Sequence, residues 1–194
     1  MSAIIATFMS ILGFCQWLAN TPWSIALHES QYMYSVVESL HVLNLTLFVG
    51  LAAMLDLRLL GFAFRRVSIS EMVDRLMPWL ISGFIVMVVS GLLLFYAIPV
   101  RTFQNVFFRA KLVFLVLAGV NVWLFHTGIY KSIAEWTLAP QPPRKARLAG
   151  LLSIVLWASI IIAGRMIAYN WFDCDIQPQS AIVNWWAGCV VDSH

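Results

Sequence analysis

A small set of polar side chains could do chemistry inside an otherwise apolar chain. Glu38 and His41 are three residues apart and therefore share one face of a helix. A histidine can ligate haem iron or donate a hydrogen bond to a quinone, with a neighbouring carboxylate orienting its second ring nitrogen. Cationic side chains can pair with haem propionates or with a quinone oxygen. The candidate cofactor-binding residues are Glu38, His41, Arg109, Lys111, Arg165 and Tyr169, with His41 as the candidate metal ligand.

The composition indicates what must position these side chains. Of the 194 residues, 61% are hydrophobic and 11% are charged, whereas an ordinary soluble domain has roughly 45–50% and about 25%. This composition excludes a soluble monomer. There is no basic run with interleaved aromatic residues, which argues against nucleic acid as a partner. A spanning helix needs about 20 mainly apolar residues, so the chain has room for about four spans.

Four long apolar segments are separated by short stretches that collect the charges, prolines and turn residues. They lie at about 33–60, 77–98, 108–130 and 148–170. We therefore predict an all-α fold, an integral membrane four-helix bundle over residues 31–170 that contacts the lipid bilayer. Residues 1–30 are predicted to form amphipathic interfacial helices, and residues 171–194 a tryptophan-rich tail.

The distribution of positive charge predicts the orientation of these spans. The first 57 residues contain no Lys or Arg. The connections after the first and the third span carry most of the basic residues, so the positive-inside rule places both in the cytoplasm. Both termini then lie on the periplasmic side of a bacterial cytoplasmic (inner) membrane.

The N-terminal segment is predicted to lie in the outer interface. Residues 2–19 are apolar but have neither the basic region nor the cleavage site of a signal peptide. Hydrophobic residues recur there at helical spacing, at Ile4, Phe8, Leu12 and Cys15. A short fifth span is the alternative. Thr21 followed by Pro22 is typical of a helix N-cap and predicts a second short helix over about 22–29.

The orientation sets the depth of the ionisable residues. A charge at mid-bilayer costs about 2.5–3.5 kcal/mol, so residues of this kind are candidates for function. Glu38 and His41 lie in the first turns of the first span, and Arg109 and Lys111 in those of the third. Arg165 follows 17 uncharged residues of the fourth span, roughly 25 Å from the inner boundary. All of them belong to one layer in the outer half of the bundle.

A structural role is the alternative interpretation of this layer. Glu38 could form an ion pair with Arg165 or Lys111, and part of the basic set could reach lipid phosphates.

A haem b bound by His41 would need a second axial ligand. The candidates are His28, Met33, Met87 and Met166. His126 lies near the inner end of the third span, too far in depth from His41 for one haem to join both. We expect His126 to be an interfacial or polar-network residue.

Two charged residues end the first span. Asp56 and Arg58 are two residues apart and do not face each other on a regular helix. Arg58 is predicted to meet lipid headgroups. Asp56 is predicted to cap its helix or to pair with Arg65 or Arg66.

Small and amide-bearing residues are predicted to pack the spans together. Gly83 and Gly91 permit close contact between helices. Asn44, Asn121 and Trp157 supply polar groups at mid-depth and are expected to make interhelical hydrogen bonds.

The cysteines bear on the compartment. Cys174 and Cys189 share the C-terminal tail and are the candidate disulfide, which an oxidising periplasm allows. Two unrelated buried thiols are the alternative.

Several short motifs resemble those of a known family. They are Glu38-Ser39-Leu40-His41, Asp56-Leu57-Arg58-Leu59-Leu60-Gly61, Asn121 and Gly164-Arg165. Over about residues 20–170 the chain resembles an uncharacterised family of small bacterial multi-pass inner-membrane proteins, a domain of unknown function with E-S/T-x-H and DLRLLG motifs. The resemblance implies four membrane helices and supplies no catalytic role.

Three functions remain open at this point. The first is an electron-transfer component that binds haem b or quinone in the outer half and exchanges electrons with a periplasmic redox partner. The second is an accessory, non-catalytic subunit of a larger membrane enzyme complex, with the tail as a docking element. The third is a small transporter or ion-conducting protein. Whether the protein is an enzyme is left open.

Overall fold

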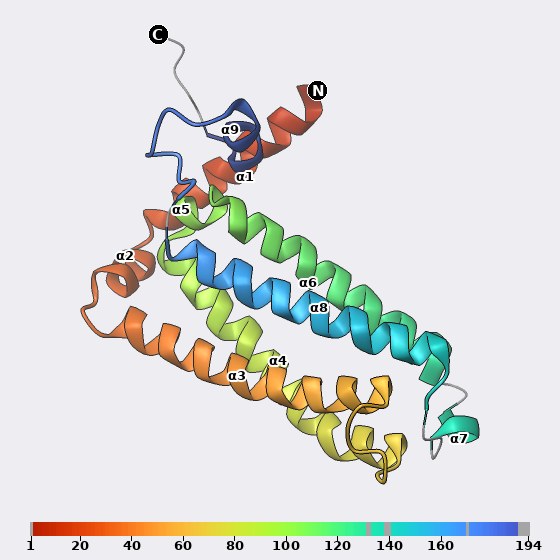
Figure 1. The fold of residues 1–194 in the computed structure, drawn as a ribbon. Helices are drawn as coiled ribbons and strands as arrows, with labels where there is room; N and C mark the ends of the chain where they lie inside the picture. The colour runs from red at the N-terminus through yellow and green to blue at the C-terminus, as the bar shows by residue number, and fades with distance from the viewer. Residues whose placement is uncertain (1, 131–132, 138–140, 170, 190–194) are drawn as a thin grey trace. The chain divides into compact units, whose positions relative to one another are not determined.

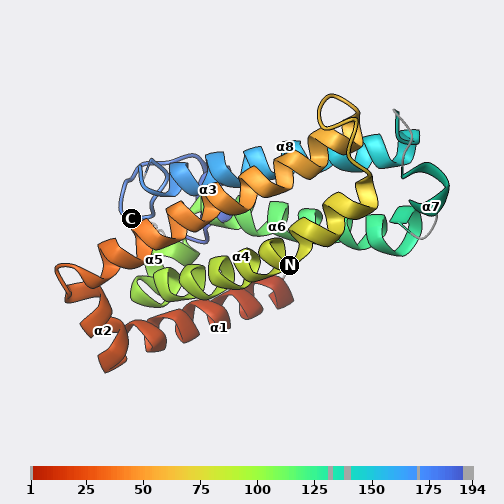
Figure 2. The ribbon, with the colours of Figure 1, turned by 90° about the horizontal axis from the view of Figure 1, so that it is seen from below.

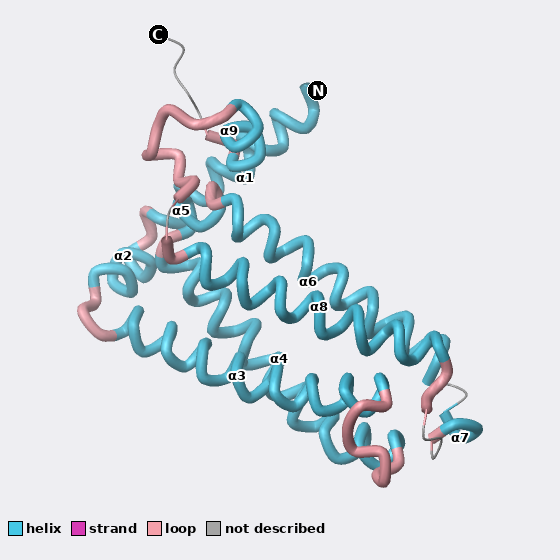
Figure 3. Tube along the Cα trace, in the orientation of Figure 1, coloured by secondary structure: helices cyan, strands magenta, loops and turns pink. Residues whose placement is uncertain are grey.

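Every regular element in the described part of the chain is a helix (Figures 1 and 3). The computed structural model describes residues 2–130, 133–137, 141–169 and 171–189. The four long apolar helices are α3 (Met33–Leu60), α4 (Ile69–Ala97), α6 (Val106–Leu124) with its π-helical continuation η1 (Phe125–Ile129), and α8 (Arg144–Ile167). Each is long and apolar enough to cross a membrane, which confirms the predicted membrane helical bundle.

Shorter helices lie before, between and after the long ones in the sequence. They are α1 (Ser2–Ala19), α2 (Pro22–Glu29), α5 (Pro99–Phe103), α7 (Ile133–Trp136) and α9 (Ala181–Ala187). Figure 2 shows α1 and α2 as successive helices joined by a tight turn. The sequence predicted α1 and α2 but not α5, α7 or α9, because runs of seven residues or fewer carry too little periodicity.

The chain forms two compact units. Unit 1 comprises Met1–Leu40, Val89–Leu112 and Ile162–His194, and unit 2 comprises His41–Val88 and Val113–Ile161. Each unit takes one part of every long helix.

The start of α4 differs from the prediction. The helix begins at Ile69 rather than near residue 77, so its first two turns place charged residues beside the buried Ile69, Met72 and Val73. The Ser68 hydroxyl accepts a hydrogen bond from the Glu71 backbone N–H at 3.2 Å, as expected of a capping box, S-x-x-E. Glu71 also pairs with Arg75 one turn further on, at 2.8 Å. Hydropathy alone missed this extension because charged residues fill it.

The end of α3 is set by Gly61. Its φ of 76° is in the left-handed region that favours glycine. The Gly61 N–H donates to the Arg58 carbonyl and the Phe62 N–H to the Leu57 carbonyl, both at 3.1 Å, which is the Schellman motif. The glycine of the DLRLLG motif therefore stops the helix and turns the chain toward α4.

In unit 1, α1 packs against α5. Leu12 and Cys15 are buried in this contact, and burial raises the pKa of the Cys15 thiol. The opposite side of α1 also carries large apolar side chains, because Ile11, Phe14 and Trp17 are exposed. A helix that is apolar on its free side fits the lipid interface predicted for it.

Thr21 stands at the N-cap of α2, as predicted, but its side chain does not cap the helix. Its hydroxyl donates to the Leu18 carbonyl at 2.7 Å and lies 2.8 Å from the Tyr96 hydroxyl. Ser24 donates to the Tyr96 carbonyl at 2.8 Å. The threonine and Ser24 therefore tie α2 to the end of α4 instead of completing a capping bond.

The C-terminal segment is held on α5 and the start of α6, within unit 1. A disulfide joins Cys174 to Cys189. The buried Asp173 carboxylate accepts hydrogen bonds from Arg101 and from Asn105, each at 3.1 Å. The Asn105 side-chain oxygen also caps α6 by accepting from the Phe107 N–H at 3.0 Å. Within residues 171–189 these contacts attach the chain to α5 and to the start of α6.

In unit 2 the long helices approach closely at two glycines. The Asn44 amide donates to the Gly83 carbonyl at 2.8 Å, which is the interhelical bond predicted for Asn44. A Cβ on Gly150 would lie 3.1 Å from the backbone oxygen of Asp56 and 3.1 Å from the Leu59 Cβ. Gly150 therefore lets α8 approach the backbone of α3. The sequence interpretation found Gly83 but missed Gly150.

Candidate functional site

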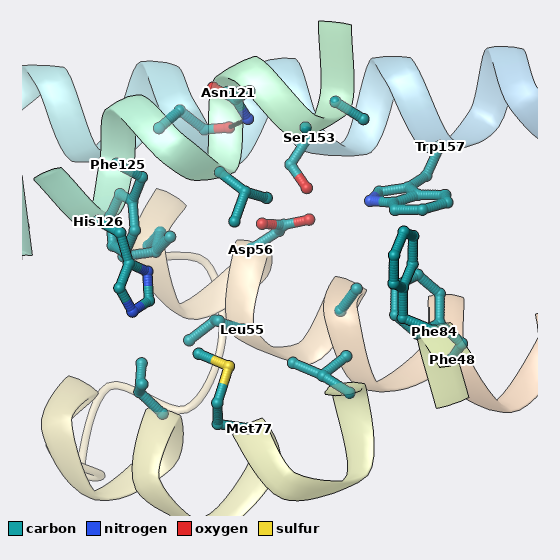
Figure 4. A pocket seen from close by; sticks show the side chains of 18 of the residues that line it. Phe48, Leu55, Asp56, Met77, Phe84, Asn121, Phe125, His126, Ser153 and Trp157 are labelled. Carbon is teal, nitrogen blue, oxygen red and sulfur yellow. Dashed lines mark hydrogen bonds between the residues drawn. The ribbon is translucent and has the colours of Figure 1, made fainter. Parts of the chain in front are cut away.

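Unit 2 contains a cavity of about 380 Å³ between its helices (Figure 4). Side chains from α3, α4, α6 with η1, and α8 line it, and most of them are aliphatic or aromatic. On α3 and α8 the lining residues recur at spacings of three and four positions, as one helix face requires. Small-molecule sites in proteins occupy about 300–1,000 Å³ and are mainly apolar with a few polar groups. The cavity has the size and character of a site of this kind.

Asp56 supplies a carboxylate to this site. It is 6% exposed, and its carboxylate points toward the Ser153 hydroxyl of α8 (Figure 4). Its Oδ2 atom is buried and has no hydrogen-bond partner among the described residues. A buried carboxylate oxygen without a partner is costly, so it marks a place where a ligand or a proton is expected.

A histidine and an amide add further polar groups to the cavity wall. His126 lies in η1, and its ring stacks on Tyr130 with centroids 5.0 Å apart. Asn121 lies one turn earlier and donates to the Ala149 carbonyl of α8 at 3.0 Å, as predicted for an interhelical amide. Short π-helical segments are frequent at functional sites. His126 therefore lies on the cavity wall and is exposed, and its predicted role as an interfacial or polar-network residue stays a prediction.

The cavity opens between α4 and α6. Its lining residues on α3 and α8 are buried or half-buried, whereas several on the other two helices are exposed. The exposed lining residues include Ile81 and Phe84 of α4 and Gly119, Val122 and His126 of α6 and η1. Because these helices cross the membrane, a ligand would enter this opening from the lipid.

Aromatic rings close one end of the cavity. Phe48 of α3 and Trp157 of α8 meet edge to face with centroids 4.8 Å apart, and Phe84 lies beside them (Figure 4). At other places on the wall, Met77 and His126 point into the same space (Figure 4).

Two predictions for the end of α3 are wrong. Arg58 does not meet headgroups: it is 0% exposed, and it donates to the Val67 carbonyl at 2.9 Å and to the Thr137 carbonyl at 3.4 Å. Asp56 does not pair with Arg65, which donates to the Gly61 carbonyl, and no ion pair joins it to Arg66 within the described residues. The DLRLLG motif thus supplies three different functions in the structure. Asp56 lines the cavity, Arg58 donates hydrogen bonds to two separate segments, and Gly61 ends the helix.

The predicted outer layer is only partly assembled, in unit 1. The Lys111 ammonium lies against Gly164, 3.4 Å from where a Cβ would be. The Arg165 guanidinium lies 5.2 Å from the centre of the Tyr169 ring, a cation–π contact. Lys111, Arg165 and Tyr169 are therefore all associated with the end of α8.

Arg109 is used by the C-terminal segment. Its guanidinium donates to the Phe103 carbonyl at 2.9 Å and to the Trp186 carbonyl, and it lies over the Phe103 ring. Glu38 is exposed, and within the described chain it forms no ion pair with Lys111 or Arg165. The structural ion pair considered for this layer is thus not formed.

His41 is buried at the start of unit 2. Across the described ranges no group of three or more His, Cys, Asp or Glu side chains could hold a metal ion. A haem needs fewer protein ligands, so this finding does not bear on His41 as an axial ligand.

The sequence carried one signal for Asp56 that the sequence interpretation did not use. Phe48, Ala52 and Asp56 are spaced by four residues, so all three lie on one face of α3. Since Phe48 and Ala52 are typical core residues, Asp56 had to face the core with them. No pattern in the sequence marked Ser153 as its partner.

One comparison with known proteins identifies a family. A family of unknown function, DUF6644, matches residues 27–170, which include all four long helices up to the end of α8. No curated protein and no solved structure matches the chain. The match leaves out α1 and the C-terminal segment but contains the whole cavity. This integral membrane protein belongs to the DUF6644 family.

Proposed function

We propose that the protein is an electron-transfer component of the membrane that binds a quinone in the cavity of unit 2. One observation carries the proposal: an apolar cavity between membrane-spanning helices contains a buried carboxylate oxygen without a partner among the described residues. Quinones are apolar molecules with two polar oxygens on one ring. The opening between α4 and α6 gives access from the bilayer, where quinones dissolve.

The cavity wall supplies the groups that a quinone head requires. Asp56 and Ser153 together offer a hydrogen bond to one ring oxygen, and His126 lies on the same wall for the other. The rings of Phe48, Phe84 and Trp157 provide flat apolar surfaces for the head. The isoprenoid tail would leave between α4 and α6 into lipid.

The orientation proposed with this function follows from charge and disulfide chemistry. Basic residues gather in the α3–α4 loop, at Arg65 and Arg66, and at the start of α8, at Arg144, Lys145 and Arg147, so these two regions face the cytoplasm. One span separates the start of α8 from the Cys174–Cys189 disulfide, which then lies in the oxidising periplasm of a bacterium. Both termini would lie on that side, available to a redox partner or a larger membrane complex.

Quinone titration of the purified full chain in lipid nanodiscs tests the proposal. A short-chain benzoquinone should quench tryptophan fluorescence saturably, because Trp157 lines the cavity. Trp157→Phe should remove this saturable component. Trp123→Phe is the matched control, since Trp123 belongs to α6 but does not line the cavity.

A second matched pair uses the serines of α8. Ser153→Ala should weaken quinone binding by roughly two- to tenfold, the value of one ordinary hydrogen bond, because the hydroxyl group that faces the Asp56 carboxyl group is lost. Ser159→Ala should leave it unchanged, because the Ser159 hydroxyl donates to Val155 in its own helix. Quenching that does not saturate, or that Ser153→Ala and Trp157→Phe leave intact, would overturn the proposal.

The absorbance spectrum of the same sample tests haem b, the alternative cofactor. A sharp reduced-minus-oxidised spectrum that disappears in His41→Ala would place a haem at His41 and favour it over the quinone. A colourless protein with saturable quinone binding supports the quinone.

A further inference from the structure

The environment of the Asp56 carboxyl group bears on proton transfer. The group points toward the Ser153 hydroxyl across the cavity wall (Figure 4). Its Oδ2 atom lies buried at the cavity without a partner among the described residues. A buried carboxyl group with an oxygen open to the cavity can exchange a proton with a molecule bound there.

The groups around Asp56 leave few other candidates for this exchange. His126 is the other titratable residue that lines the cavity, and the lining residues from α4 and α8 contain no Asp, Glu, Lys, Arg or His. Arg58 is two residues away on α3, but it donates to the Val67 and Thr137 carbonyls. Apart from His126, no residue that lines the cavity could place a positive charge beside the Asp56 carboxylate.

We propose that Asp56 is the group that passes a proton to the bound quinone through Oδ2 when the quinone is reduced, and takes it back when the quinol is oxidised. This inference rests on the proposed quinone site. On reduction the O–H bond of the carboxyl group breaks and an O–H bond forms on the near quinone oxygen. The two electrons come one at a time from a redox protein that carries haem or an iron–sulfur cluster, which is oxidised, and a hydronium ion from solvent gives the second proton to the far oxygen and becomes water.

The two ligand forms then require different states of Asp56. Quinone accepts a hydrogen bond and binds the protonated carboxyl, whereas quinol donates one and binds the carboxylate. By linkage, the dissociation constant of quinone divided by that of quinol rises about tenfold per pH unit. Quinone binding therefore weakens relative to quinol binding as the pH rises. A site without proton exchange gives a ratio independent of pH.

The test measures both dissociation constants between pH 5.5 and 8.5, roughly the range in which the ligands stay intact, on the full chain in nanodiscs. The ligands are a short-chain benzoquinone and its dithionite-reduced quinol. Asp56→Asn keeps the shape and the Ser153 contact but cannot lose a proton. In wild type and in His126→Gln, we expect the ratio of the two dissociation constants to change about tenfold per pH unit. In Asp56→Asn, we expect this ratio to be independent of pH.

Each other outcome has a defined meaning. A flat ratio in wild type overturns proton exchange at Asp56 and leaves the quinone site standing. If the pH dependence of the ratio persists in Asp56→Asn but is lost in His126→Gln, His126 is the residue that exchanges the proton, and the inference is overturned. Failure of wild type to bind either form contradicts the proposed function itself. If Asp56→Asn binds neither form, Asp56→Glu decides: it should retain the slope, and a flat ratio overturns the inference.

Discussion

The Asp56 carboxylate of α3 points toward the Ser153 hydroxyl of α8 (Figure 4), while its Oδ2 atom has no hydrogen-bond partner within the described chain. Gly150, one turn before Ser153, brings the two helices close enough for this contact, because α8 passes directly over the Asp56 backbone. Packing and the candidate site are therefore linked: the glycine sets the helix separation and the serine orients the carboxylate.

The carboxylate should cost stability while it serves binding. Replacing a poorly paired buried charge by an apolar residue of similar size is often stabilising. We expect Asp56→Leu to raise the free energy of unfolding of the ligand-free protein by about 1–2 kcal/mol and to abolish quinone binding. Denaturation in mixed micelles followed by circular dichroism measures the first effect.

The control for Asp56→Leu is Asn44→Leu, also on α3. Asn44 makes an interhelical hydrogen bond to Gly83, so its loss should lower stability by about 0.6–1 kcal/mol. If both variants lose stability equally, Asp56 is a structural residue and the functional interpretation fails.

Gly150 should tolerate no side chain. In Gly150→Ala the new Cβ meets the Asp56 backbone oxygen and the Leu59 Cβ at 3.1 Å, so α8 must move away from α3. Overpacking costs about 1–3 kcal/mol, more than the gain of up to about 1 kcal/mol in helix propensity. Gly50→Ala, where nothing lies within 4 Å, should be neutral or slightly stabilising in the same unfolding assay. Equal stability of the two variants would contradict the close approach.

Arg58 should not be replaceable by lysine. Its guanidinium donates to carbonyls of both the α3–α4 loop and the segment before α8, and a single ammonium cannot reproduce that fork. Arg58→Lys is expected to cost about 1.5–3 kcal/mol and to speed amide hydrogen exchange at residues 61–69. Arg66→Lys, an exposed change in the same loop, should alter neither quantity. Unchanged amide hydrogen exchange in Arg58→Lys would show that the two hydrogen bonds of Arg58 are not needed to hold these segments.

Cysteine labelling checks the proposed orientation. In intact cells a membrane-impermeant maleimide should label Gln31→Cys and leave Arg66→Cys unlabelled until the cells are opened, because these exposed residues flank α3 at its two ends. Cys15 adds little background: it is buried, and its raised pKa lowers the thiolate fraction that reacts. The reverse labelling pattern would invert the topology.

The spans could be predicted from the sequence because each satisfies a local requirement of length and apolarity. The predicted range 33–60 for the first span matches α3, and Asn44 and Asn121 make the interhelical bonds expected of them. The start of α4 was missed because a capping box at Ser68 outweighs the charges that follow it. Local chemistry fixes that boundary, and mean hydropathy does not report it.

The site could not be predicted in the same way, because it depends on which residues of different helices meet. Depth along the spans predicted one layer of Glu38, Arg109, Lys111 and Arg165, yet Arg109 bonds to the C-terminal segment and Glu38 stays exposed. Asp56 was predicted to cap its helix or to pair with Arg65 or Arg66, because it lies near the end of α3. Its true environment comes from α8, ninety-seven residues later in the chain at Ser153.

Photo-cross-linking with an azidoquinone tests the central claim, quinone binding in the unit 2 cavity, most directly. The full chain in nanodiscs is irradiated with the probe, digested and analysed by mass spectrometry. We predict that the label attaches to the cavity residues of α4 and α6, above all Phe84 and Val122, and that excess unlabelled quinone removes it. Label spread over the outward faces of the helices, or concentrated in unit 1 near Arg165 and insensitive to competitor, would contradict a quinone site at Asp56.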